Sequence, residues 1–115
     1  MKLSVIIPTK NRAVLLGKAL ESIINQSLNQ NEFEVIVVDN GSTDNTKEIV
    51  KDFNIRIENL RYFYDATPGL HVGRHIGMKE AKSDILVYLD DDVELFSDHL
   101  QNVLISFEDQ TVVLV

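Results

Sequence analysis

Residues 85–92 read ILVYLDDD, a short apolar run that leads directly into three consecutive carboxylates. An apolar run of this length, rich in β-branched and aromatic residues, predicts a buried strand over Ile85–Leu89. Three adjacent negative charges repel one another, which is costly without a nearby cation. Because ligands of open α/β sheets bind beyond the carboxyl ends of the strands, the stretch predicts a site for a hard cation and an anionic ligand such as a phosphate.

The rest of the chain alternates between strand-like and helical patterns. Strands are predicted at 3–7, 33–38, 57–64 and 85–89, with a last strand-like run at 111–115. Helices are predicted at 12–26, from about 44 to 53, at 70–81 and at 98–108. This order predicts an α/β fold: a Rossmann-like, mostly parallel, twisted sheet with helices on both faces.

The bulk composition restricts the class of protein. The 115 residues carry a net charge of −7 and 44% hydrophobic residues, which is typical of one soluble globular domain without nucleic-acid partners. The sequence has no cysteine, which excludes disulfides and thiolate sites. It also has no apolar run of roughly 18 residues and no secretory signal. We expect a cytoplasmic domain; membrane association of the full-length protein stays open.

Polar residues follow three of the predicted strands. These are Pro8-Thr9, Asp39-Asn40-Gly41 and Asp90-Asp91-Asp92. In a parallel sheet the three strand ends lie along one edge, so their side chains are expected to share a site. The outer residues of the acidic group, Asp90 and Asp92, are two positions apart, so their side chains can point to the same side of an extended backbone. One of them could then bind a ribose hydroxyl and the other could bind Mg²⁺ or Mn²⁺.

Each of the other segments allows a functional and a structural interpretation. Asp39 can accept hydrogen bonds from a ribose or a base, or it can form a turn with the two residues after it. The loop 8–12 can face a polar ligand with its amides, or it can simply connect a strand to a helix capped by Asn11. It contains no Gly-rich phosphate-binding pattern.

The segment 69–77 is unusual because Gly73 and Gly77 lie inside a predicted helix. Each glycine costs about 1 kcal/mol relative to alanine, which suggests close approach of a backbone or a ligand. Arg74 lies between them and can bind a diphosphate or remain a surface residue. His71 and His75 have a zinc-compatible spacing but no partner with recognisable metal-binding spacing.

Together these segments resemble the family 2 glycosyltransferases of the GT-A fold. The resemblance rests on four motifs in family order: P-T-x-N-R at 8–12, V-D-x-G-S-x-D-x-T at 38–46, G-x-x-x-A-R-N-x-G at 69–77, and D-x-D at 90–92. Gly73 and His75 depart from the third motif, which leaves the contacts of that segment open.

The resemblance implies a nucleotide-diphosphate sugar donor, most often linked to UDP. Its sugar is transferred with inversion to an acceptor hydroxyl, on a saccharide or a lipid-linked molecule. The implied residue roles are uridine binding by Pro8, Thr9, Arg12 and Asp39, donor contact by Arg74, ribose contact by Asp90 or Asp91, and ligation of Mg²⁺ or Mn²⁺ by Asp92.

In this family the catalytic base and the acceptor site follow the metal motif, so both are expected beyond residue 115. Residues 1–115 are therefore expected to form a single nucleotide-sugar-binding domain, truncated before the acceptor half, that binds donor without efficient transfer. An exposed edge strand at 111–115 would favour homo-oligomers. The alternatives are a non-catalytic nucleotide-binding or assembly module and a receiver-like signalling domain. The latter needs an acidic pair after the first strand, where residues 9–12 read TKNR.

Overall fold

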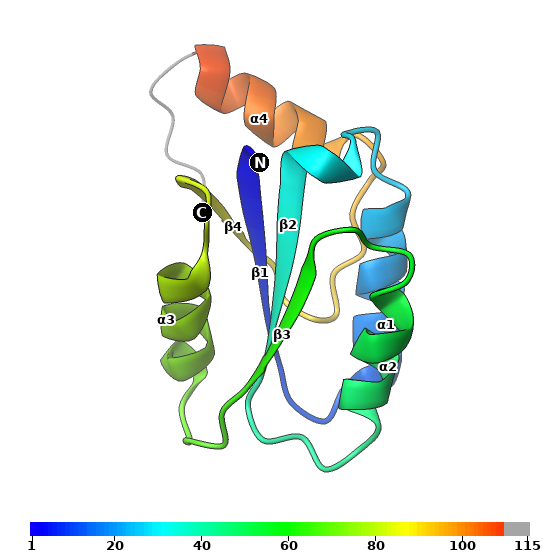
Figure 1. Cartoon of the computed structure of the whole chain (residues 1–115), viewed down its shortest axis with the longest axis vertical. Helices are drawn as coiled ribbons and strands as arrows, with labels where there is room; N and C mark the ends of the chain where they lie inside the picture. Colours follow the sequence, from blue (N-terminus) through cyan, green and yellow to red (C-terminus); the bar gives the residue numbers. More distant parts are fainter. Residues whose placement is uncertain (110–115) are drawn as a thin grey trace.

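The computed structural model describes residues 1–109, which form one parallel sheet with helices on both faces (Figure 1). The elements in chain order are β1 (Leu3–Thr9), α1 (Ala13–Ile24), a short 3₁₀ turn η1 (Gln30–Glu32), β2 (Phe33–Asp39), α2 (Thr46–Phe53), β3 (Leu60–Tyr64), α3 (Leu70–Glu80), β4 (Ile85–Tyr88) and α4 (His99–Asp109). The predicted α/β class is confirmed. The predicted strand at 111–115 lies outside the described residues.

The sheet has the strand order β3-β2-β1-β4, and every pair of neighbours is parallel. In register, Thr9 at the end of β1 lies opposite Asp39 at the end of β2. Tyr88, the last residue of β4, lies opposite Ile6 of β1. All four carboxyl ends therefore lie along one edge of the sheet, which is the edge that the sequence predicts for a site.

Side chains of β1 alternate between two cores of unequal size. Leu3, Val5 and Ile7 face the larger core, which α1, α2 and α4 cover. Ile6 faces the smaller core beneath α3, together with Ile36 and Val38 of β2. Figure 1 shows α3 alone on its side of the sheet, with α1 and α2 on the other side.

Two glycines let α3 lie directly against β1. A Cβ atom at Gly73 would come 3.1 Å from Cβ of Pro8, and one at Gly77 would overlap with Cγ2 of Ile6. The predicted close approach at these positions is confirmed, and the neighbour is a strand of the same chain. The packing places the first turns of α3, including Arg74, beside the carboxyl end of β1.

One local prediction differs from the structure. The third strand begins at Leu60 instead of residue 57, because residues 54–59 form turns in which Ile57 N–H donates to the Phe53 carbonyl. Ile57 is still buried, so its apolar character reflects core packing rather than strand pairing.

No helix among residues 1–109 combines the length and apolarity needed to cross a membrane.

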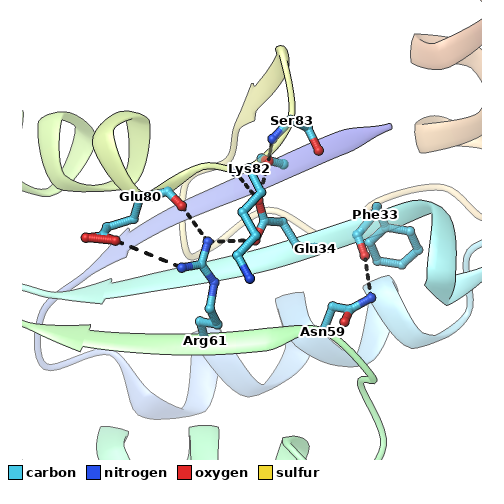
Figure 2. Close-up of polar contacts among 8 residues, drawn as sticks. Phe33, Glu34, Asn59, Arg61, Glu80, Lys82 and Ser83 are labelled. Carbon is cyan, nitrogen blue, oxygen red and sulfur yellow. Dashed lines mark hydrogen bonds and ion pairs between the residues drawn. The ribbon is translucent and has the colours of Figure 1, made fainter. Parts of the chain in front are cut away.

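A cluster of charged and polar groups is buried in the amino-terminal half of the sheet, beneath the end of α3 (Figure 2). Glu34 of β2 is 1% exposed. Its carboxylate accepts hydrogen bonds from Ser4 Oγ at 2.6 Å, Lys82 N–H at 2.7 Å and Arg61 Nη2 at 2.7 Å. Arg61 Nη2 also donates to the Glu80 carbonyl.

Burial by itself would raise the pKa of Glu34. The hydrogen bonds from Ser4, Lys82 N–H and Arg61 outweigh that effect and hold the pKa below its usual value. The cluster therefore contains a charged, hydrogen-bonded carboxylate that ties the α3–β4 connection to the sheet.

Candidate functional site

A cleft of about 330 Å³ opens at the carboxyl ends of the strands. The residues that line it come from the ends of β1, β2 and β4 and from the first turns of α3: Pro8, Thr9, Lys10, Arg12, Asn40, Gly73, Arg74, Asp90, Asp91 and Asp92. The structure thus brings together most of the residues that the sequence singles out. Lys10 and Asn40 are additional, although both lie inside motifs quoted above.

Asp91 is the buried member of the acidic group. Its exposure is 6%, whereas Asp90 and Asp92 are exposed. Thr9 Oγ1 donates to Asp91 Oδ2 at 2.8 Å, and Arg12 Nη1 lies 3.3 Å from Asp91 Oδ1. The two oxygens of Asp91 therefore tie the loop after β4 to the last residue of β1 and to the loop that follows it, and the outer two carboxylates remain exposed.

Asp92 is suited to a hard divalent cation that also binds phosphate. Its side chain is 52% exposed, and its Oδ2 lies 4.0 Å from Arg12 Nη1. In residues 1–109 no three acidic, histidine or cysteine side chains are grouped so that they could hold a metal. A cation held by Asp92 would therefore need ligand or water oxygens as well, which is the usual arrangement for Mg²⁺.

Cationic side chains border the same cleft in a chain of net charge −7. Lys10 and Arg12 follow β1, and Arg74 projects from α3. Arg74 also lines an adjoining cleft of about 490 Å³, where Pro8, Tyr88, Leu89, Asp90 and Val93 supply the other walls. The cleft therefore offers donors for an anionic group beside carboxylates that could hold a cation.

The loops after β1 and β2 are joined to each other by hydrogen bonds around Asn11. Asn11 has a φ of 52°, and its N–H donates to Ser42 Oγ at 2.8 Å. Its Oδ1 accepts from Thr43 N–H at 2.7 Å. The prediction that Asn11 caps the following helix is wrong, because this oxygen is directed to the other loop. Arg12 occupies the N-cap position instead and makes no side-chain cap hydrogen bond.

The amino end of α1 is instead capped by Asp44, which lies far from this helix in the sequence. Its Oδ2 accepts from Ala13 N–H, the first residue of α1, at 3.2 Å, and its Oδ1 accepts from Thr46 at the start of α2. The hydrogen bond from the Thr46 hydroxyl is the largest cause of a lowered pKa for Asp44. One carboxylate thereby joins the amino ends of both helices.

Asp39 does not line the cleft, unlike the other predicted site residues. It is 1% exposed. Its Oδ1 accepts from Ser42 N–H at 2.8 Å, and its Oδ2 accepts from the Tyr62 hydroxyl. Burial and this hydrogen bond raise the pKa of Tyr62 above its usual value. The observed contacts of Asp39 match the turn role that the sequence left open.

Asn40, the next residue, does line the cleft. Its N–H donates to the Thr9 carbonyl at 2.8 Å. Its side-chain Nδ2 donates to the backbone carbonyls of Asp65 at 2.8 Å and Thr67 at 2.7 Å. Asn40 thus connects the end of β2 to the ends of both neighbouring strands.

Residues 4–115 match the sequence model of glycosyl transferase family 2. One similar protein is the GalNAc(5)-diNAcBac-PP-undecaprenol beta-1,3-glucosyltransferase of Campylobacter jejuni, which is 38% identical over 105 residues. That match covers 90% of this chain and 33% of the relative.

The solved structures that resemble this fold include two proteins with a bound nucleotide or nucleotide sugar. S. aureus TarS 1-349 in complex with UDP matches with a TM-score of 0.89 and 31% identity, over 95% of this chain and 32% of that chain. The mannosyltransferase PcManGT from Pyrobaculum calidifontis, in complex with GDP-Man and Mn²⁺, matches with a TM-score of 0.73 and 28% identity, over 79% of this chain and 27% of that one. The chain therefore spans about a third of the length of these proteins.

Proposed function

Because the chain belongs to glycosyl transferase family 2 and has the GT-A fold, we propose that its strand-end cleft binds a nucleotide-diphosphate sugar. The observation that carries this proposal is the cleft itself, in which Lys10, Arg12 and Arg74 meet two exposed carboxylates at the carboxyl ends of parallel strands. A UDP-linked sugar is the preferred donor, since TarS is bound to UDP.

The position of each residue supports the role that we propose for it. Pro8, Thr9 and Arg12 form the floor beneath the nucleoside, and Asp39 orders the turn beside it through its Ser42 and Tyr62 contacts. Arg74 and Lys10 offer N–H donors to the diphosphate. Asp90 accepts from the ribose hydroxyls, while Asp91 holds Arg12 and Thr9 in place.

We further propose Mg²⁺ or Mn²⁺ as the cofactor, with Asp92 as its protein ligand. The carboxylate of Asp92 is accessible, and oxygen ligands suit both ions. PcManGT is bound to Mn²⁺ together with GDP-Man. When bound, the ion would offset the charge that develops on the diphosphate leaving group.

Transfer of the sugar to an acceptor hydroxyl, with inversion, is the proposed activity of the whole protein. The acceptor is expected to be a saccharide or a lipid-linked molecule, since the Campylobacter relative is named for an undecaprenol-linked substrate. A carboxylate general base is expected outside these 115 residues. The chain alone is therefore proposed to bind donor without efficient transfer.

Isothermal titration of the chain with UDP and Mn²⁺ tests donor binding. We expect saturable heat at submillimolar to millimolar nucleotide, and a marked loss of the Mn²⁺-dependent part in Asp92→Asn. The matched control is Asp84→Asn, which removes the same charge from an exposed residue just before β4, away from the cleft-lining residues. Absence of heat at millimolar UDP would contradict donor binding, and efficient transfer by the chain alone would contradict the donor-only role.

A further inference from the structure

The outer side of β3 is a free edge of the sheet in the described part of the chain. β3 stands last in the strand order and pairs with β2 on its inner side. Asp65 N–H, directly after β3, donates to the Asp39 carbonyl at the end of β2. Because the backbone groups of successive strand residues point to opposite sides, every second residue of β3 faces away from β2. The N–H and C=O groups that face away are those of Leu60, Tyr62 and Tyr64.

This edge lacks the features that usually prevent strand pairing. Within residues 1–109, no hydrogen bond uses the outward backbone groups of β3. The strand reads LRYFY, without proline, glycine or lysine. Its one charged side chain, Arg61, is directed to Glu34 of the neighbouring strand, and Tyr64 is 57% exposed. Figure 1 shows α2 on one side of β3 and α3 on the other, so the edge between them is open for another strand.

We propose that β3 pairs antiparallel with β3 of a second copy of this chain, across a two-fold axis at Tyr62. In this register Tyr62 lies opposite its own counterpart, and Leu60 lies opposite Tyr64 of the second copy. Each outward N–H and C=O of the strand then has a partner. A shifted register would move Leu60 or Tyr64 out of the paired segment, so this register is the one that uses the whole edge.

The side chains of β3 fit this register on both faces of the sheet. On the face covered by α2, the exposed Tyr64 ring would pack against Leu60 of the second copy. On the other face, Arg61 would lie opposite Phe63. Arg61 already lies over Phe63 of its own chain, 5.5 Å from the ring centre. The pairing therefore extends an arginine–aromatic contact that the single chain contains.

The charges that flank β3 are also compatible with two identical strands. Glu58 would lie opposite Ala66 of the second copy, and Asp65 would lie opposite Asn59. No like charges therefore face each other along the paired segment, although the whole chain carries a net charge of −7.

The other edge of the described sheet, β4, does not fit a second copy in this way. Leu89 N–H donates to β1, so Leu86 and Tyr88 carry the outward groups of β4. Antiparallel pairing of these two residues with their counterparts would place Asp84 directly opposite Asp90. Like charges in that position are destabilising, so the contrast between the two edges favours β3.

This arrangement leaves both nucleotide clefts open. Two antiparallel β3 strands direct the carboxyl ends of their sheets in opposite directions, and the clefts lie at those ends. The inference is therefore independent of the proposed function, and its test needs no nucleotide.

Amide hydrogen exchange of the whole chain tests the pairing, because it observes the edge directly. In dilute solution the N–H groups of Tyr62 and Tyr64 should exchange rapidly. At near-millimolar protein their protection should rise about tenfold or more, while light scattering shows a dimer. The N–H groups of Arg61 and Phe63 bond to β2 and should be protected at both concentrations. A monomer throughout, or a dimer in which Tyr62 and Tyr64 stay unprotected, would overturn the inference.

Cysteine cross-linking locates the two-fold axis, because the chain has no cysteine of its own. Tyr62→Cys should form a disulfide-linked dimer on oxidation, since residues opposite each other in a hydrogen-bonded pair have Cα atoms about 5.5 Å apart. The matched control is Val87→Cys, at the corresponding position of β4, which should remain monomeric. If Tyr62→Cys does not fold, hydrogen exchange of the unmodified chain still decides.

A charge on the edge provides the second variant. Tyr64→Lys changes an exposed residue and should abolish the dimer, since an edge lysine resists burial between paired strands. A dimer unaffected by Tyr64→Lys, or cross-linking at Val87 in place of Tyr62, would contradict pairing through β3.

Discussion

Two carboxylates of this domain, Glu34 in β2 and Asp91 in the turn after β4, are buried with the same kinds of partners but in opposite settings. Each accepts from a hydroxyl group on β1 and from an arginine. The residues around Glu34 form a closed cluster, because the α3–β4 connection covers them, and the arginine of this cluster, Arg61, is 28% exposed (Figure 2). The residues around Asp91 form a cluster that is open to the cleft, its arginine is 54% exposed, and two exposed carboxylates flank it.

The difference shows that a buried charge does not by itself mark a functional site. Glu34 has the more complete set of protein partners, and its lowered pKa reflects them. Such a group stabilises the position of α3 on the sheet. Asp91 instead arranges Arg12, Thr9 and the loop after β4 so that neighbouring polar groups remain accessible. We therefore expect substitutions in the two clusters to separate stability from ligand binding.

The largest expected effect is on the closed cluster. Arg61→Leu leaves Glu34 buried without its cation and should lower the free energy of unfolding by about 3–5 kcal/mol. Urea unfolding followed by circular dichroism measures this loss. Glu80→Ala is the control, because its carboxylate is 4.0 Å from Arg61 and 39% exposed, and it should change stability by less than about 1 kcal/mol. Equal effects of the two variants would show that Glu34 does not depend on Arg61.

The second effect concerns the open cluster. Arg12→Ala should lower the affinity for UDP roughly ten- to hundredfold, in line with the loss of a hydrogen bond to a charged group. Its effect on stability should be about 1 kcal/mol, since the side chain is half exposed. Isothermal titration and urea unfolding of the same sample give both values. A large loss of stability with unchanged affinity would reverse the roles assigned to the two clusters.

The third prediction concerns α3, which runs from the open cluster to the closed one. Gly77→Ala places a methyl group against Ile6 and should cost about 1–2 kcal/mol, because overpacking outweighs the gain in helix propensity. The control is Gly17→Ala in α1, where the nearest atom would be at 3.8 Å. That variant should be neutral or stabilising by up to about 1 kcal/mol. A stabilised Gly77→Ala would mean that α3 is not held tightly against β1.

The smallest expected effect is the pH dependence of the closed cluster. The folded-state pKa of Glu34 lies below its unfolded value of about 4.5, so the unfolded chain takes up the extra proton as the pH falls through this range. Stability contributed by Glu34 is present above about pH 4.5 and is lost on acidification. Urea unfolding between pH 6 and 3 should show a steeper loss for the natural chain than for Glu34→Gln. Parallel curves would remove Glu34 as a source of acid sensitivity.

Much of the fold is readable from the sequence because apolar periodicity is a local property. The four strands, the four helices and the shared strand ends all follow from it, and the acidic group after β4 marks the correct edge. Glu34 is not readable in this way, because a single carboxylate inside the run 33–38 gives no sign of its partners on β1 and β3.

The details of the site depend on contacts between loops that are distant in sequence. Asn11 looks like a helix cap, but its oxygen binds the loop after β2, about thirty residues away. Asp39 and Asn40 are adjacent, and only the folded chain shows that the first is buried while the second meets the cleft. Both residues are polar and both lie at the end of β2, so the sequence does not show which of them lines the cleft. The tertiary structure decides between them.

An NMR titration of the isotopically labelled chain with UDP and Mg²⁺ tests the central claim most directly, because it observes both clusters in one experiment. We expect saturable shifts for the backbone amides of Thr9, Arg12, Asn40, Arg74 and Asp92, and no significant shifts for Ser4, Glu34, Arg61 and Lys82. Shifts centred on Glu34, or no saturable shift at millimolar UDP, would contradict the assignment of nucleotide binding to the open cluster.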